Sequence, residues 1–300
     1  MKIGTIGIGG MGAPMAQNLV QDGDSVLAFD IAPEKVDAIT GPGLERAESV
    51  TQIAQDCGLI ILMTPDDKAL RDVMYGDTGI LSVVSFTGCV VDLSTTSEIL
   101  AREIGAAVTA RGAGYLDGAV IGGGVNKARK GTSPVIVSGD ETLFEKYKPK
   151  LERLGSVDYA GEQGNAKIVK ICNNLLLGIN TVSGAEALSI GEAAGLTLED
   201  MTRWLDDSSG NTAALQGMFG HFVQNGTFPE GIASLKFYDK DMSLGCDLAE
   251  RNAFPAHFTH LTRQIFATAA QVEGADAPFA SILTYYRAMQ HAVPEDDRRG

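Results

Sequence analysis

The chain begins with KIGTIGIGGMGAPMAQNL (residues 2–19), which predicts a strand, a glycine turn and a helix in immediate succession. Lys2–Ile6 is a short β-forming run, and G-x-G-x-x-G follows it directly. In this motif the first glycine permits a tight turn, the second admits a pyrophosphate, and the third lets helix and strand pack closely. A glycine-rich turn without a ligand is the alternative interpretation. The residues predicted to bind a dinucleotide here are Gly7, Gly9, Gly10, Met11 and Gly12.

An acidic residue ends the next predicted strand. Ser25–Phe29 is followed by Asp30, about 20 residues beyond the glycines, where dinucleotide sites place a carboxylate. Such a carboxylate accepts hydrogen bonds from both ribose hydroxyls of NAD and repels the 2′-phosphate of NADP. No arginine occurs in IAPEK (residues 31–35), and Lys35 is expected a turn further along a helix. NAD is therefore the predicted cofactor.

Composition limits the class of protein. The 300 residues suffice for two domains, and 44% of them are hydrophobic, which supports a core of normal size. The net charge of −14 argues against a nucleic-acid partner, because phosphate binding needs a basic face. The four cysteines and four histidines show no metal-ligand spacing, so we predict no metal and free thiols in a reducing compartment. Without a signal peptide or a long apolar run, we expect a cytoplasmic protein with no membrane contact.

Strand and helix patterns alternate over the first half of the chain, which predicts an α/β fold with a doubly wound parallel sheet, the Rossmann arrangement. After Gly164 the pattern is helical up to about Val293. We therefore predict a Rossmann domain (residues 1–162) joined by a long helix to an all-α C-terminal domain (residues 163–300). The further strands expected in the sheet are Gly58–Met63, Cys89–Leu93, Tyr115–Val120, Pro134–Ser138 and Ser156–Tyr159.

The long helix is predicted by GEQGNAKIVKICNNLLLGINTVSGAEALSIGEAAG (residues 161–195), which contains no proline. Lys170 and Asn174 are four residues apart and stack on one side of this helix. An ammonium beside a carboxamide is either a proton-transfer pair or a solvated surface pair, and the spacing alone leaves both open. The apolar residues that recur at three- and four-residue steps, typical of one helix face, are Ile168, Ile171, Cys172, Leu175, Leu176, Ile179 and Val182.

The sequence GIGGMGAPMAQNL (residues 7–19) resembles the signature of the β-hydroxyacid dehydrogenase family, which includes 3-hydroxyisobutyrate dehydrogenase and tartronate semialdehyde reductase. KICNN resembles the family's catalytic segment and places its lysine and asparagine on Lys170 and Asn174. DLSTTSE is similar to the family's D-x-S-T turn, which puts Thr95 near the nicotinamide ribose. Lys240, followed by an aspartate, resembles a lysine that reaches towards nicotinamide and substrate.

The resemblance implies a set of site residues. Lys170 would exchange the proton, and Asn174 would fix the lysine and contact the substrate. Further cofactor contacts are expected at Met63, Thr64, Thr95 and Lys240. The substrate contacts expected are Ser94, Ile121, Gly122, Gly123, Asn174 and Lys240.

The substrate loop departs from the family pattern. Members carry D-A-P-V-S-G-G, whose serine and glycine amides bind the substrate carboxylate, whereas this chain has DGAVIGGG (residues 117–124). Depending on the register, Ile121 or Gly122 takes the serine position, so the hydroxyl is missing either way. Consecutive glycine amides can still form an anion-binding concavity. Lys127, Arg129 and Lys130 beyond it are either substrate contacts or a solvated face.

The sequence thus predicts reversible NAD-dependent oxidation of a small anionic β-hydroxyacid to its semialdehyde or ketone. To act as a base, Lys170 must have a pKa below the ordinary value of ~10.4. Lys167, one turn earlier, and the positively charged oxidised nicotinamide are the candidate neighbouring charges. The alternatives are a sulfonate, phosphonate or imine substrate, or a catalytically silent NAD-binding scaffold. A 6-phosphogluconate activity is less favoured, because the C-terminal half is short for that subgroup. By resemblance, a homodimer or homotetramer is expected.

Overall fold

The computed structural model describes residues 1–20 and 23–291 and divides the chain into two compact units, Met1–Lys170 and Ile171–Gly300. Helix α8 (Asn165–Ala193) runs through this division, as the predicted long helix requires. The proposed domain boundary between residues 162 and 163 stays a prediction. The last residues of the predicted helical region, 292 and 293, lie outside the described residues.

Within the described residues, a single eight-stranded sheet organises the first unit, in the order β3-β2-β1-β4-β5-β6-β7-β8. The strand order reverses between β1 and β4, which is the switch point where doubly wound sheets bind dinucleotides. This arrangement confirms the predicted Rossmann domain. The strands are β1 (Lys2–Ile6), β2 (Ser25–Phe29), β3 (Leu44–Arg46), β4 (Leu59–Leu62), β5 (Cys89–Asp92), β6 (Gly114–Val120), β7 (Val135–Gly139) and β8 (Val157–Tyr159).

Two features of the sheet differ from the prediction. Strand β3 has three residues and buries only Leu44, so its sequence carries no apolar run. Strand β7 pairs with β6 in the antiparallel sense, not the predicted parallel one. The connection between them contains only the six-residue helix α6 (Gly124–Arg129). This helix spans about 9 Å at 1.5 Å per residue, too little to return along β6, which is about 23 Å long.

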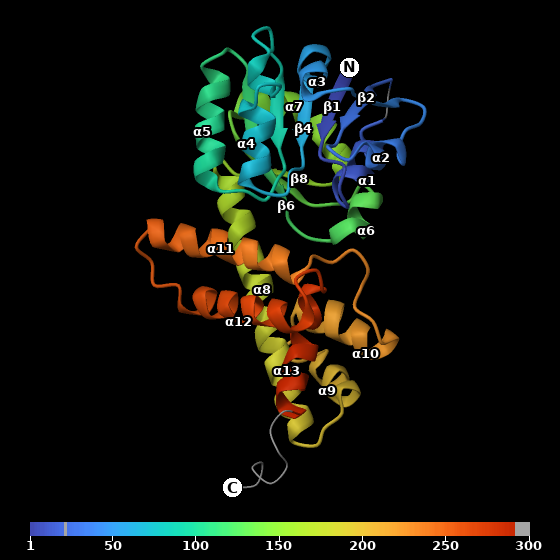
Figure 1. Ribbon diagram of the computed structural model, residues 1–300, viewed down its shortest axis with the longest axis vertical. Helices are drawn as coiled ribbons and strands as arrows, with labels where there is room; N and C mark the ends of the chain where they lie inside the picture. Colours follow the sequence, from blue (N-terminus) through green and yellow to red (C-terminus); the bar gives the residue numbers. More distant parts are fainter. Residues whose placement is uncertain (21–22, 292–300) are drawn as a thin grey trace. The chain divides into compact units, whose positions relative to one another are not determined.

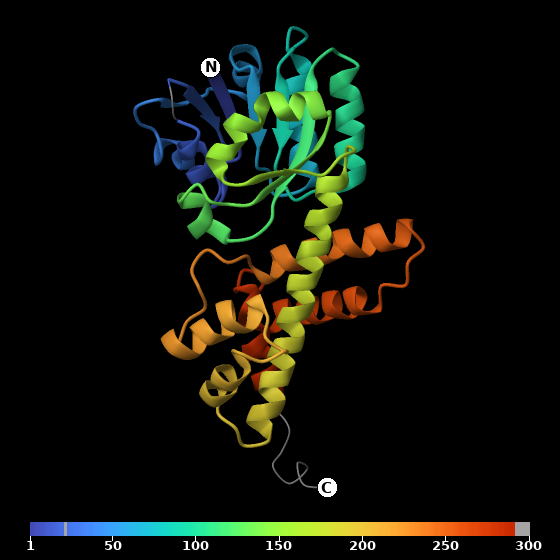
Figure 2. The same cartoon turned by 180° about the vertical axis from the view of Figure 1, so that it is seen from behind.

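Helices cover both faces of the sheet (Figures 1 and 2). Met15 of α1, its C-cap Leu19 and Phe144 of α7 pack on one face, and Ile53 of α3 and Leu70 of α4 pack on the other. Ser97 caps α5, and its side chain accepts the Leu100 N–H. The remaining helices of this unit are α1 (Gly12–Asn18), α2 (Pro33–Asp37), α3 (Val50–Asp56), α4 (Asp67–Tyr75), α5 (Glu98–Thr109) and α7 (Glu141–Leu151).

The second unit is helical and forms its own core. Tyr238 stacks on Phe279 with ring centroids 4.0 Å apart, and Phe219 and Phe266 are fully buried beside them. None of the helices in the described residues is long and apolar enough to cross a membrane. The helices that follow α8 are α9 (Leu198–Leu205), α10 (His221–Asn225), α11 (Leu235–Arg251), α12 (His257–Glu273) and α13 (Ile282–His291).

The buried face of helix α8 matches the predicted one only in part. Ile171, Val182 and Leu188 are buried, but Cys172 is exposed and Leu176 is 65% exposed. The helix has more apolar side chains than inward positions, and glycines take some inward positions. An apolar pattern alone therefore could not separate its core face from its outer face.

Candidate functional site

The glycine turn after β1 has the geometry expected of a dinucleotide site. Gly7 has φ +96°, and a Cβ on Gly12 would collide with the carbonyl oxygen of Gly7, so neither position tolerates a side chain. Gly9 is exposed and has open space where its Cβ would lie. The turn is thus closed towards the protein and open towards a ligand, which fits a pyrophosphate.

Asp30 braces this turn from the end of β2. Its Oδ2 accepts the Ile8 N–H at 2.7 Å, and its Oδ1 accepts the Ala32 N–H at 2.9 Å. Lys35 lies in α2, as expected, but its ammonium comes within 3.6 Å of Oδ1. The carboxylate that the sequence predicts to bind the ribose therefore has a cation next to it.

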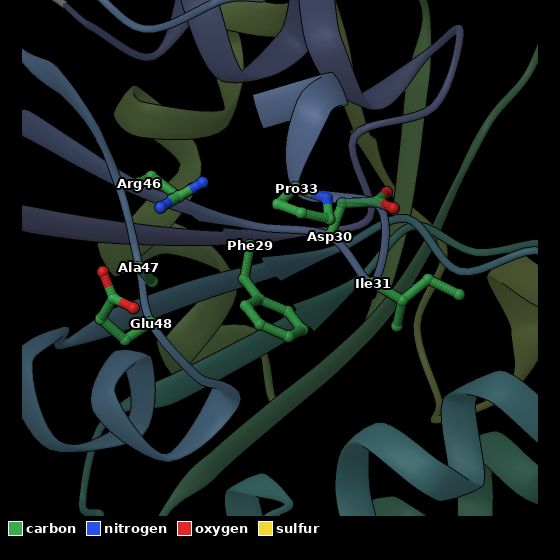
Figure 3. Close-up of a pocket in the computed structure, with 7 residues that line it drawn as sticks. All are labelled: Phe29, Asp30, Ile31, Pro33, Arg46, Ala47 and Glu48. Atoms are coloured by element: carbon green, nitrogen blue, oxygen red, sulfur yellow. The ribbon is translucent and has the colours of Figure 1, made fainter. Parts of the chain in front are cut away.

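A pocket of about 350 Å³ lies beside Asp30. Figure 3 shows the Asp30 carboxylate on one side of it, and Arg46 and Glu48 on the other side, with the Phe29 ring between. Arg46 donates a hydrogen bond to Asp37 at 3.0 Å. Sequence reasoning missed this arginine because it belongs to the unpredicted strand β3.

The next two strand ends are joined by side chains. The Thr64 N–H donates to Ser94 Oγ at 2.8 Å, and the two hydroxyls are 2.9 Å apart. Both side chains are buried. Ser94, expected to contact the substrate, thus has its hydroxyl engaged by Thr64, after β4. Met63 precedes Thr64, with its carbonyl close against Gly7, and Thr95 is half-buried.

The loop after β6 is a run of left-handed glycines. Gly122, Gly123 and Gly124 have φ values of +114°, +83° and +52°. The Ile121 N–H donates to the Pro134 carbonyl at 2.9 Å, which fixes the loop to the start of β7. The Lys127 stem occupies the space beside Gly123 where a Cβ would be. The missing serine is therefore replaced by exposed backbone with a cationic side chain folded against it.

Lys170 reaches the same loop. Its Nζ donates to the Val120 carbonyl at 2.8 Å, at the carboxyl end of β6. Lys167, one turn earlier on α8, is fully buried, and its ammonium lies 2.8 Å from Asp92 Oδ2. The predicted neighbouring charge is thus present but is paired with a carboxylate.

Asp117 anchors the start of α8. Its Oδ1 accepts the Gly164 N–H at 2.8 Å, and its Oδ2 accepts the Ser138 hydroxyl at 2.8 Å. Ser138 in turn accepts the Ala166 N–H at 2.9 Å, so side chains of β6 and β7 satisfy amides at the helix start that have no partner within the helix. Burial is the main cause that raises the pKa of Asp117. In the sequence this residue served only to align the substrate loop.

In the second unit one buried carboxylate holds two predicted site residues. The Asn174 Nδ2 donates to Asp241 Oδ2 at 2.7 Å, and the Lys240 ammonium is 3.0 Å from Asp241 Oδ1. Asn173 donates to Asn174 Oδ1 at 3.0 Å. Because Asp241 only accepts hydrogen bonds when ionised, it fixes which end of the Asn174 amide faces it. The Lys240–Asp241 pair is recognisable in the sequence, but a role is predicted there only for the lysine.

The predicted residues thus fall into two sets. In the first unit the glycine turn, Asp30, the strand ends after β4, β5 and β6, and Lys170 share the carboxyl edge of the sheet. In the second unit Asn174 and Lys240 share Asp241. Over residues 1–20 and 23–291, no group of three or more His, Cys, Asp or Glu side chains could hold a metal ion.

Two family models match this chain. The NAD-binding domain of 6-phosphogluconate dehydrogenase covers residues 2–169, and the NAD-binding model of NADP-dependent 3-hydroxyisobutyrate dehydrogenase covers residues 164–286. The chain belongs to the β-hydroxyacid dehydrogenase family. Members of this family are NAD(P)-dependent oxidoreductases, and the glycine turn fits such a cofactor.

Individual relatives support this family assignment. The 2-(hydroxymethyl)glutarate dehydrogenase of Eubacterium barkeri is 34% identical over 89% of this chain and 88% of that protein. The 3-hydroxyisobutyrate dehydrogenase of Pseudomonas aeruginosa is 33% identical over 95% and 98% of the two chains. The structure of Mycobacterium tuberculosis 3-hydroxyisobutyrate dehydrogenase with L-serine has a TM-score of 0.84 at 26% identity and covers 95% of this chain and 99% of that one.

Proposed function

We propose that this protein catalyses the reversible NAD-dependent oxidation of a small β-hydroxyacid, with Lys170 as the general acid and base. The observation that carries the proposal is the Lys170 ammonium, 2.8 Å from the Val120 carbonyl at the entrance of the glycine loop. A substrate bound by the loop would then have its hydroxyl near this lysine. Two relatives named for hydroxyacid substrates, at 34% and 33% identity, support the substrate class.

Each site residue would have a separate role in this reaction. When bound, the nicotinamide exchanges a hydride with the substrate carbon. Lys170 Nζ takes the hydroxyl proton in oxidation and returns it in reduction. Gly122 and Gly123 offer amides to the acid group of the substrate. The family resemblance assigns a further substrate contact to Asn174, whose amide is held by Asp241.

NAD rather than NADP is the proposed cofactor. The support is Asp30, whose carboxylate repels a 2′-phosphate. Lys35, 3.6 Å from Asp30, and Arg46 in the adjoining pocket reduce that repulsion. We therefore expect preference for NAD with measurable binding of NADP, and calorimetric titration of both dinucleotides measures the ratio.

A substrate with an unusual acid group is the second candidate. The observation in its favour is the absence of a hydroxyl at positions 121–124, together with Lys127 folded against Gly123. A loop of glycine amides and a nearby ammonium suits a second carboxylate, a sulfonate or a phosphonate.

A coupled experiment tests both candidates. NADH formation is followed by absorbance with a panel of hydroxyacids that includes 3-hydroxyisobutyrate, 2-(hydroxymethyl)glutarate and serine, and with sulfonate and phosphonate analogues. We expect NAD reduction with at least one panel member, and the preferred acid group identifies the candidate. Calorimetric NAD binding without reduction by any of them would contradict both candidates and favour a silent scaffold.

We also propose a cytoplasmic homodimer or homotetramer. Its support is an outward apolar side of α8, where Leu176 and Ile190 are 65% and 63% exposed beside Cys172. Apolar groups of this size on one helix favour a protein partner, and a second copy meets them with the same surface. Light scattering should give two or four chains, and Leu176→Lys should lower that number; a parent protein that stays monomeric contradicts the proposal.

A further inference from the structure

Lys167 is a buried cation that the proposed reaction does not use. Its side chain is 0% exposed, although lysine is almost never fully buried unless it is paired. Its ammonium lies 2.8 Å from Asp92 Oδ2 and donates to the main-chain oxygens of Asp92 (2.9 Å), Ser94 (2.7 Å) and Gly118 (2.9 Å). All four partner atoms are oxygens that accept hydrogen bonds. A neutral amine would have to point its lone pair at one of these oxygens, so the contacts favour the ammonium form.

These contacts tie several strand ends to α8. Asp92 ends β5, Ser94 lies in the following turn, and Gly118 is in β6. Ser94 also bonds Thr64 after β4, so one ammonium connects the edges of three neighbouring strands to the helix.

Lys167 and Lys170 together fix the register of α8 against β6. Lys167 holds the Gly118 carbonyl, and Lys170 holds the Val120 carbonyl two residues further on. The two lysines are separated by a rise of about 4.5 Å along the helix, and the two carbonyls by about 6.6 Å along the strand. Two contacts at separate points restrict both sliding and rotation of the helix start relative to β6.

Asp92 balances the charge of Lys167. Its side chain is also 0% exposed, and it accepts the Ser94 N–H at 3.0 Å and the Tyr115 hydroxyl at 3.2 Å. The pair therefore adds little net charge beside Lys170. A buried ion pair is seldom more stabilising than apolar residues of the same volume, so stability alone does not account for this one.

We propose that Lys167 is a positioning residue for the proposed reaction, which holds Lys170 in place while Asp92 cancels its charge. The inference rests on the proposed function. The sequence predicted Lys167 only as a charge near Lys170, whereas the proposed role is to hold Lys170 in position.

The test uses Lys167→Gln, Asp92→Asn and the double variant in the full-length protein. Without the ammonium, Lys167→Gln and the double variant should lower the plateau turnover by about 10-fold or more, since small misplacements of a reacting group have effects of this size. NAD affinity should remain unchanged. Lys150→Gln is the matched control, because Lys150 pairs with the buried Asp24 elsewhere in the same unit; it should lower the melting temperature and leave turnover unchanged.

The pH profile of oxidation separates positioning from a general loss of stability. Lys167→Gln leaves a negative charge, which raises the pKa of Lys170 and moves the acidic limb to higher pH. Asp92→Asn leaves a positive charge and moves the limb to lower pH, whereas the double variant leaves it unmoved. Parent-like turnover in the folded double variant, or limbs that move in the same direction in both single variants, would overturn the proposal.

A second measurement does not depend on activity. Reductive methylation of Lys170, followed by mass spectrometry, should be faster in the double variant, because the lysine is released from Val120. An unchanged methylation rate would overturn the positioning role even if a single variant fails to fold. If none of the tested substrates supports NAD reduction by the parent protein, the proposed function fails. The methylation result still decides whether Lys167 positions Lys170.

Discussion

The two sets of site residues are held in different ways. In the first unit Lys170 and Lys167 bond main-chain carbonyls of β6, and Lys167 adds two more carbonyls and Asp92. In the second unit Asn174 and Lys240 depend on the side chain of Asp241. Main-chain acceptors persist through substitution, whereas a side-chain acceptor can be removed. Substitution of Lys167 or Lys170 should therefore disturb the first set, and substitution of Asp241 should disturb the second.

Lys170→Ala should have the largest effect. It removes the proton-transfer group and leaves the carbonyls in place, so turnover should fall by about 100-fold or more. The affinity for NAD should stay close to that of the parent, because the glycine turn is untouched. Steady-state kinetics and calorimetry measure the two quantities, with Lys146→Ala on the exposed side of α7 as a control; turnover close to the parent's would show that another group moves the proton.

Asp241→Asn should have the next largest effect. An amide at this position no longer selects the orientation of Asn174 and no longer attracts Lys240, so kcat/KM should fall by about 10-fold. The matched control is Asp239→Asn, which removes a half-exposed carboxylate from the same helix, 3.4 Å from Arg263. Equal kinetics for the two variants would mean that Asp241 does not organise these residues.

Asp30→Ser should change cofactor choice more than turnover. Its loss removes an acceptor for the ribose, and a hydrogen bond to a charged group contributes about 1.5–3 kcal/mol. NAD should therefore bind about 10-fold more weakly or worse. NADP should gain relative to NAD, because Lys35 and Arg46 remain. Titration of both dinucleotides checks this; an unchanged NAD to NADP ratio would show that Asp30 only supports the turn.

Substitution of Asp24 should lower stability and leave turnover unchanged. Hydrogen bonding to Lys150 is the main cause that holds its pKa well below the usual 3.8, and Arg153 lies 2.8 Å away. A carboxyl with a depressed native pKa contributes stability above its unfolded pKa, and that contribution is lost as pH falls through the native value. Urea midpoints should therefore fall below about pH 4 in the parent. Asp24→Asn should be less stable at neutral pH and show a smaller acid loss; parallel curves would contradict this account.

Local patterns predicted much of this molecule. The glycine turn, Asp30 and the long helix with Lys170 are each encoded within a few neighbouring residues, so their interpretation needed no tertiary contacts. Strand β3 carried no such pattern, and Arg46 was missed with it. The antiparallel β7 depends on how far a six-residue helix can reach.

The contacts of the site were harder to predict than its residues. Asp241 follows Lys240 in the sequence, but its bond to Asn174 joins residues 67 positions apart. Lys167 appeared as a charge near Lys170, and its carbonyl partners lie 49 to 75 positions away. Such partners are set by packing between distant segments, which periodicity and spacing do not contain.

Chemical rescue tests most directly whether Lys170 moves the proton. The Lys170→Ala variant is assayed for oxidation with increasing concentrations of small primary amines of different pKa. We predict that turnover rises with amine concentration and depends on amine basicity, because a free amine replaces the missing Nζ. Turnover that stays near the parent level without amine, or a low turnover that no amine changes, would contradict the proposed role of Lys170.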